Sequence, residues 1–157
     1  TMRQKIKSNK TALVQAVDLL ARQEHSTQKL REKLRQRGYE EEEIEAAIQR
    51  LEEKHYLNDE DACARQFQYL YENSRSSVKQ IQAKLMQRGF ESSLIRSCIP
   101  SDTFQRETRA ALHCLRLKFR AGAEARKMMQ HLYTRGFDSS AMRAAIDAFQ
   151  QENNTEE

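Results

Sequence analysis

The sequence predicts an all-α fold in which three tandem three-helix repeats stack into a curved, elongated array. Of its 157 residues 38% are hydrophobic and 32% are charged, and a single proline and four glycines are too few turn residues for a sheet protein. Segments 34–39, 85–90 and 132–137 share one spacing of Leu followed by Arg-Gly-aromatic. Glycine permits the left-handed conformation that ends a helix, and the next aromatic residue can pack back onto the last turn. Three equivalent helix ends therefore predict a repeat.

The first repeat is expected at 12–58, behind a basic segment at 1–11. Apolar residues at helical spacing predict its first helix over 10–22. This helix carries one wide apolar stripe, formed by Leu13, Val14, Ala16, Val17, Leu20 and Ala21. Ser26 can accept a hydrogen bond from a free backbone amide, so we expect it to cap a second helix that ends at Gly38.

The glutamates at 40–43 are expected at the start of the third helix of the repeat, because acidic side chains are favoured at the amide end of a helix. Apolar positions in the second and third helices recur at fixed distances from the three glycines. The equivalent sets are Leu30, Ile81 and Met128; Leu34, Leu85 and Leu132; Ile44, Ile95 and Met142; and Ile48, Ile99 and Ile146. One core is therefore predicted three times.

The second repeat is expected at 59–102 and the third at 103–150, with a disordered acidic tail at 151–157. Pro100 should end the last helix of the second repeat early, because the residue before a proline disfavours helical geometry. The first helices of the three repeats are assigned one phase through a shared leucine position, namely Leu19, Leu70 and Leu117.

The sequence contains no pattern typical of an enzyme. Gly122 is the only glycine outside the helix ends, and no phosphate-binding loop or dinucleotide motif is present. The histidines never fall at metal-ligand spacing with the cysteines, so we expect no catalysis, no cofactor and no metal. The cysteines are expected to be reduced; they are Cys63, Cys98 and Cys114. No signal peptide or membrane-spanning run is present, which predicts a cytoplasmic protein with no membrane contact.

Basic residues gather in two blocks although the formal net charge is only +4. Residues 1–37 hold ten Lys or Arg against three acidic residues, and 103–137 hold eight against two. Such blocks favour a polyanion or an acidic protein surface, in a salt-dependent way. The candidate contact residues are Lys29, Arg31, Lys33, Arg35, Arg37, Arg116, Lys118, Arg120, Arg126 and Lys127.

Four aromatic residues near these blocks could stack on bases, as in proteins that bind single strands: Tyr39, Phe119, Tyr133 and Phe137. Helix-end packing is the simpler interpretation of Tyr39 and Phe137.

Two runs in the first third of the chain closely resemble the N-terminal signature of the RecX family of bacterial recombination regulators. They are AVDLLARQEHS at 16–26 and LREKLRQRGY at 30–39. Segments 56–59 and 62–67 continue the resemblance, although Asn58 stands where the family often has Asp. The resemblance covers about residues 12–150 and also includes the three repeats of three helices.

The resemblance implies a partner and an activity. Members of this family bind the filament that the RecA recombinase forms on single-stranded DNA, and limit its growth or promote its disassembly. They thereby lower ATPase, strand-exchange and co-protease activities. We expect this chain to act in the same way, as a monomer. Two alternatives stay open: a protein that binds DNA directly without recombinase, and a helical adaptor for another protein.

Overall fold

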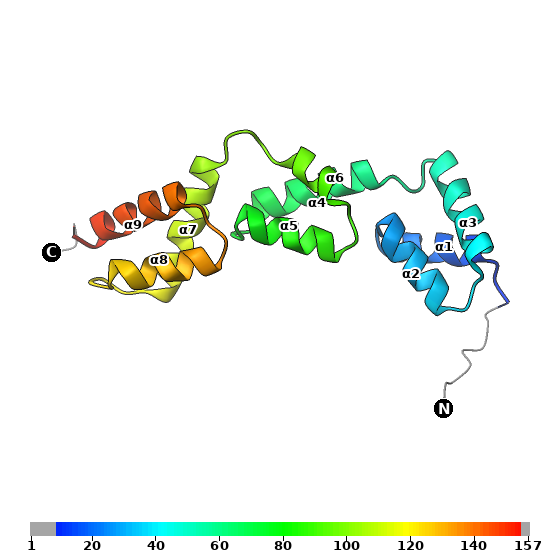
Figure 1. Ribbon diagram of the computed structural model, residues 1–157, viewed down its shortest axis with the longest axis horizontal. Helices are drawn as coiled ribbons and strands as arrows, with labels where there is room; N and C mark the ends of the chain where they lie inside the picture. The colour runs from blue at the N-terminus through cyan, green and yellow to red at the C-terminus, as the bar shows by residue number, and fades with distance from the viewer. Residues whose placement is uncertain (1–8, 155–157) are drawn as a thin grey trace, which may run out of the picture. The chain divides into compact units, whose positions relative to one another are not determined.

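The computed structural model describes residues 9–154, and within that range the backbone forms helices and no strand (Figure 1). The helices are α1 (Ala12–Arg22), α2 (Thr27–Gln36), α3 (Glu41–Glu53), α4 (Asp59–Asn73), α5 (Val78–Gln87), α6 (Ser92–Cys98), α7 (Phe104–Lys118), α8 (Ala125–Thr134) and α9 (Ser139–Asn154). The all-α prediction is confirmed. Most of the predicted basic segment and the last three residues of the predicted tail lie outside the described residues.

The chain divides into two compact units. Unit 1 contains residues 1–65 and 85–95, and unit 2 contains 66–84 and 96–157. Each unit holds one complete three-helix bundle and part of the middle helices α4, α5 and α6. The repeat boundaries at 12–58, 59–102 and 103–150 stay a prediction.

In unit 1, helices α1, α2 and α3 contact one another and enclose a core. Its buried residues are Ala12, Ala16, Leu19, Leu30, Leu34, Tyr39, Ile44, Ala47, Ile48, Leu51 and Leu57. Ser26 caps α2 as predicted, because its hydroxyl accepts a hydrogen bond of 3.2 Å from the amide of Lys29. Thr11 caps α1 in the same way, so this helix begins two residues later than the predicted residue 10.

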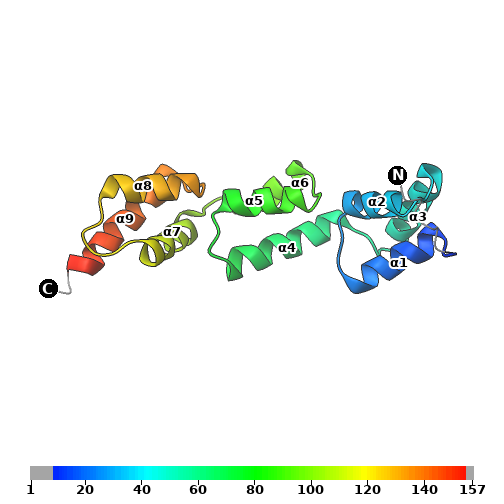
Figure 2. The ribbon, with the colours of Figure 1, turned by 90° about the horizontal axis from the view of Figure 1, so that it is seen from below.

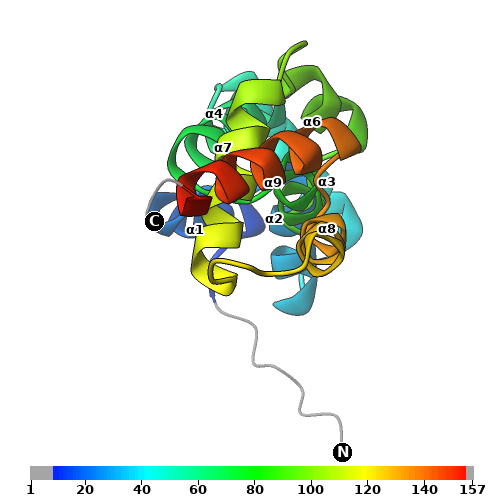
Figure 3. The same ribbon diagram turned by 90° about the vertical axis from the view of Figure 1, so that its left-hand side faces the viewer.

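In unit 2, helices α7, α8 and α9 contact one another, with α8 beside α9 in Figure 2 and α9 crossing α7 in Figure 3. Their core consists of Ala110, Ala111, Leu115, Met128, Leu132, Phe137, Met142, Ala145, Ile146 and Phe149. α9 continues to Asn154, although the third repeat was expected to end at residue 150. Burial of Phe149 and a hydrogen bond of 2.8 Å, which the Asn153 side chain donates from Nδ2 to the Phe149 carbonyl, stabilise this extension.

The three predicted helix ends are confirmed. Gly38, Gly89 and Gly136 have φ angles of 89°, 92° and 89°, in the left-handed region. At each helix end, the backbone amide of the aromatic residue after the glycine donates a hydrogen bond to the carbonyl five residues earlier. The bond from Tyr39 to Leu34, at 3.3 Å, is an example. This pattern satisfies carbonyls that the helix itself leaves unpaired.

The predicted phase of the first helices is partly wrong. Leu117 is 76% exposed, and Leu115 is buried in its place, because the core line of α7 runs through Ala111 and Leu115, four residues apart. Val14 and Val17 are also exposed, although both were assigned to the apolar stripe of α1. None of the helices between residues 9 and 154 combines the length and apolarity needed to cross a bilayer.

Candidate functional site

Much of the basic face of α2 is neutralised within unit 1. The Arg31 guanidinium donates two hydrogen bonds to the Glu45 carboxylate, at 2.7 and 3.2 Å, and these bonds raise the pKa of Arg31. Arg35 likewise donates two hydrogen bonds to the Glu41 carboxylate of α3. Lys29 lies 3.3 Å from Glu32. Glu41, which was expected at the start of α3, and Glu45, one turn further along, therefore also orient the cations of α2.

Lys33 and Arg37 occupy different surroundings. The Lys33 Nζ lies 2.7 Å from Nε2 of His25, whose Nδ1 lies 2.6 Å from the Gln23 carbonyl. Burial lowers the pKa of His25, so its neutral form donates from Nδ1 and accepts from Lys33. Arg37 is the exposed C-cap of α2 and forms no ion pair with any residue between 9 and 154.

The predicted basic residues of unit 2 lie along the end of α7, its connection to α8, and the start of α8. Arg116 donates two hydrogen bonds to the Glu152 carboxylate, from Nε and Nη2 of its guanidinium group. Four others are exposed and form no ion pair within the described part of the chain: Lys118, Arg120, Arg126 and Lys127. This segment therefore presents more uncommitted positive charge than α2 does.

The four candidate aromatic residues have different roles. Tyr39 and Phe137 are 7% and 3% exposed, which confirms helix-end packing, and the Tyr39 hydroxyl donates to the Lys10 carbonyl at 2.7 Å. Phe119 is half-buried, and its ring lies nearly perpendicular to that of His131, with ring centroids 5.6 Å apart. Tyr133 is 73% exposed, and it alone of the four presents a ring that a ligand could cover.

Sequence reasoning missed a groove between α8 and α9 with a volume of about 750 Å³. Its lining comprises Ala125, Arg126, Met129, Gln130, Tyr133, Met142, Arg143, Ile146 and Asp147. Arg143 is exposed there, yet it falls in the acidic C-terminal part of the sequence and outside both basic blocks. The i, i+3 and i+7 spacing of Arg126, Met129 and Tyr133 along α8 could have signalled this face.

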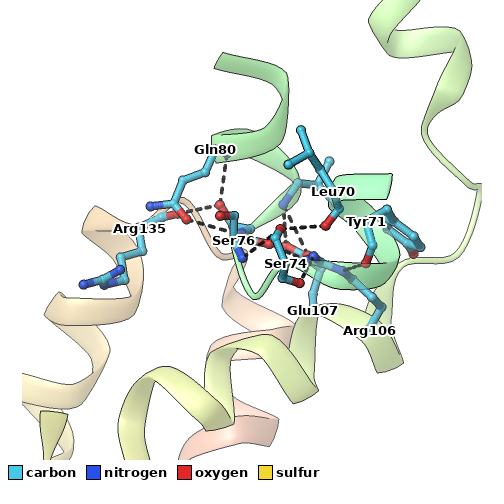
Figure 4. Close-up of polar contacts among 10 residues, drawn as sticks. Leu70, Tyr71, Ser74, Ser76, Gln80, Arg106, Glu107 and Arg135 are labelled. Atoms are coloured by element: carbon cyan, nitrogen blue, oxygen red, sulfur yellow. Dashed lines mark hydrogen bonds and ion pairs between the residues drawn. The ribbon is translucent and has the colours of Figure 1, made fainter. Parts of the chain in front are cut away.

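Arg106 lies in the second basic block, but its side chain forms contacts within unit 2 (Figure 4). Its guanidinium donates to the carbonyls of Tyr71, Ser74 and Ser76, at 3.1, 3.0 and 2.5 Å. It also pairs with the buried Glu107 at 2.6 Å and lies over the Tyr71 ring, 4.9 Å from its centroid. Arg106 is therefore a structural cation that ties the end of α4 to α7.

No metal centre can be assigned within residues 9–154, where no group of three or more His, Cys, Asp or Glu could hold an ion. None of the three cysteines forms a disulfide, and Cys63 is buried. Cys98 and Cys114 are half-buried, and burial raises the pKa of the Cys114 thiol. Raised thiol pKa values favour the unreactive protonated form.

Comparison with known proteins agrees with this architecture. A model described as the first three-helix domain of RecX matches residues 12–51. The regulatory protein RecX of Prosthecochloris aestuarii is 30% identical over 149 residues, which cover 87% of this chain and 91% of that protein. That of Neisseria meningitidis is 30% identical over 154 residues, covering 94% and 97%.

A solved RecX structure also has this fold. The crystal structure of RecX from Lactobacillus salivarius matches 89% of this chain and 95% of that one, with a TM-score of 0.76 at 17% identity. At that identity the match shows the fold, while the two relatives above carry the sequence relationship. The chain belongs to the RecX family of regulatory proteins.

Proposed function

We propose that this chain regulates the RecA recombinase by binding the filament that RecA forms on single-stranded DNA. Binding limits growth of the filament or promotes its disassembly, and so lowers ATPase, strand-exchange and co-protease activities. Membership of the RecX family over most of the chain is the observation that carries the proposal. The protein acts without catalysis, as a cytoplasmic monomer.

The distribution of cations without ion pairs favours a contact region in unit 2 over one on α2. Lys118, Arg120 and Lys127 are exposed in unit 2, and no described carboxylate neutralises them. By contrast, Arg31 and Arg35 are held by Glu45 and Glu41. A cation that has no carboxylate partner keeps its charge and its donors for phosphate or for an acidic protein surface. We therefore propose the α7–α8 connection as the main contact region, with Arg37 as the corresponding contact in unit 1.

Hydrolysis of ATP by RecA on single-stranded DNA tests the proposal. The protein is added at ratios too low to coat the DNA, and binding to the same DNA without RecA is measured in parallel. A fall in hydrolysis at these ratios supports a regulator that acts on the filament. A fall that begins only when bare DNA is saturated supports direct DNA binding instead, and no response to either supports an adaptor.

A matched pair of variants locates the contact. The test variant combines Lys118→Gln, Arg120→Gln and Lys127→Gln. Its control combines Arg22→Gln, Lys54→Gln and Arg96→Gln, which remove the same charge from exposed positions elsewhere. We expect the test variant to need about tenfold more protein for the same inhibition, with weaker salt dependence, and the control to behave like the parent. Equal inhibition by both variants would place the contact elsewhere.

A further inference from the structure

The groove between α8 and α9 combines an apolar floor with a charged rim. Met142 and Ile146 are each 6% exposed and form part of the floor, with Met129 half-buried beside them. Tyr133 stands at the rim with its ring exposed, and Arg126 and Arg143 reach the same groove from α8 and α9. All of these residues belong to unit 2.

We propose that this groove binds single-stranded DNA, with one base stacked on the Tyr133 ring and the adjoining phosphates held by Arg126 and Arg143. The assignment rests in part on the proposed function, because it names a direct contact with the DNA of the filament. It differs from that function in requiring binding to DNA alone.

The first argument is electrostatic. Arg126 and Arg143 form no ion pair with any residue that the structure describes, although Asp147 lines the same groove four residues after Arg143. In the same unit, Arg116 is held by both oxygens of Glu152, so a guanidinium here pairs when a carboxylate is suitably placed. Two uncommitted guanidinium groups on opposite sides of one groove are suited to the oxygens of a phosphate backbone.

The second argument is the shape and chemistry of the lining. A base presents two apolar faces and a polar edge, and it is stabilised by stacking on an aromatic ring without regard to sequence. The exposed Tyr133 supplies that ring, and the flexible Met129 side chain can adapt to bases of different size. An apolar partner helix would instead bury both arginines without supplying a carboxylate of its own to pair with them, which is unfavourable.

A tryptophan reporter tests the stacking directly, because the chain contains no tryptophan. Tyr133→Trp places the only indole in the groove, and Tyr69→Trp is the matched control at a 67% exposed tyrosine of α4. Addition of oligothymidylate should quench the fluorescence of Tyr133→Trp saturably and leave that of Tyr69→Trp nearly unchanged. Equal quenching of the two variants would overturn the assignment.

Fluorescence anisotropy of labelled oligothymidylate tests the energetics. We expect Tyr133→Leu to weaken binding about tenfold, and Arg126→Gln or Arg143→Gln to weaken it several-fold while reducing the salt dependence. Tyr69→Leu and Arg96→Gln are the controls and should bind like the parent. Unchanged binding by Tyr133→Leu, or no binding of bare DNA by the parent, would overturn the assignment. A parent that inhibits RecA without binding bare DNA would leave the proposed function standing.

Discussion

The Ser26 hydroxyl donates a hydrogen bond of 2.6 Å to the carbonyl of Arg88, 62 residues further along the chain and within unit 1. The same hydroxyl accepts from the Lys29 amide, so one side chain both caps α2 and holds the helix end at Gly89. Unit 2 repeats this arrangement: Ser77 accepts from the Gln80 amide at 3.1 Å and donates to the carbonyl of Arg135 at 2.5 Å. A serine cap in one repeat thus binds the helix end of the next.

Removal of this serine should destabilise unit 1 by more than the loss of an ordinary cap. Ser26→Ala removes an acceptor for the Lys29 amide and a donor for a part-buried carbonyl, which together contribute about 2 kcal/mol. Thr11→Ala is the control, since Thr11 is exposed and caps α1 through a single hydrogen bond worth about 1 kcal/mol. Urea unfolding measures both, and equal losses would show that the bond to Arg88 contributes little.

The glycines at these contacts are required for space as well as for backbone conformation. A Cβ at Gly89 would lie 2.5 Å from the Ser26 oxygen and 3.3 Å from Cβ of Gln28, whereas a Cβ at Gly122 meets nothing within 4 Å. Both residues have left-handed φ, so Gly122→Ala should lower the free energy of unfolding by about 1 kcal/mol from strain alone. Gly89→Ala should lower it by about 3 kcal/mol. Similar losses in the two variants would contradict the close contact.

This contact also shows how far the sequence could predict the fold. The helix ends and the Ser26 cap depend on residues within one turn of each other, so the local pattern was sufficient to find them. The bond from Ser26 to Arg88 joins residues in different repeats, and no local pattern reports it. Leu117 was misplaced for a related reason, since an equal distance from the helix-end glycine does not show that the equivalent leucine also faces the core.

The candidate site was predictable only in its charge. The number of basic residues in the sequence located two blocks, but it did not show which of these residues form ion pairs. Arg31 pairs with Glu45 of another helix, whereas Lys118 forms no ion pair within the described residues. Arg106 was counted as surface charge although it is largely buried. Arg143 was missed because its charge is balanced by acidic neighbours in sequence, while the opposite wall of the groove that it lines comes from α8.

Arg106 should be one of the most sensitive positions for stability in unit 2. Arg106→Met removes donors from three backbone carbonyls and leaves the buried Glu107 carboxylate without its cation, a loss of about 3 kcal/mol. Arg106→Lys should restore little of it, because one ammonium cannot reproduce the planar fork of the guanidinium. The exposed Arg109 supplies the control, and Arg109→Met should change stability by less than about 0.5 kcal/mol. Thermal and urea unfolding followed by circular dichroism would separate these outcomes, and a tolerated Arg106→Met would remove Arg106 from its structural role.

Acidification should weaken unit 1 through His25. Burial lowers the pKa of this histidine below its ordinary value of 6.5, and the nearby Lys33 ammonium acts in the same direction. Well above pH 6.5 the imidazole is neutral in both the folded and the unfolded chain, so it contributes no pH dependence. As the pH falls through 6.5, the unfolded chain takes up the proton first, and stability declines until the lower pKa of the folded state is reached.

Replacement of His25 isolates this effect from the other histidines. His25→Gln cannot titrate, so the parent should lose more stability than this variant between about pH 7.5 and 5. His55→Asn is the control, because His55 is exposed and has a φ of 60°, which asparagine tolerates. This control should follow the parent. Urea unfolding at a series of pH values gives the comparison, and parallel pH profiles for the parent and His25→Gln would show that His25 is not held neutral by its surroundings.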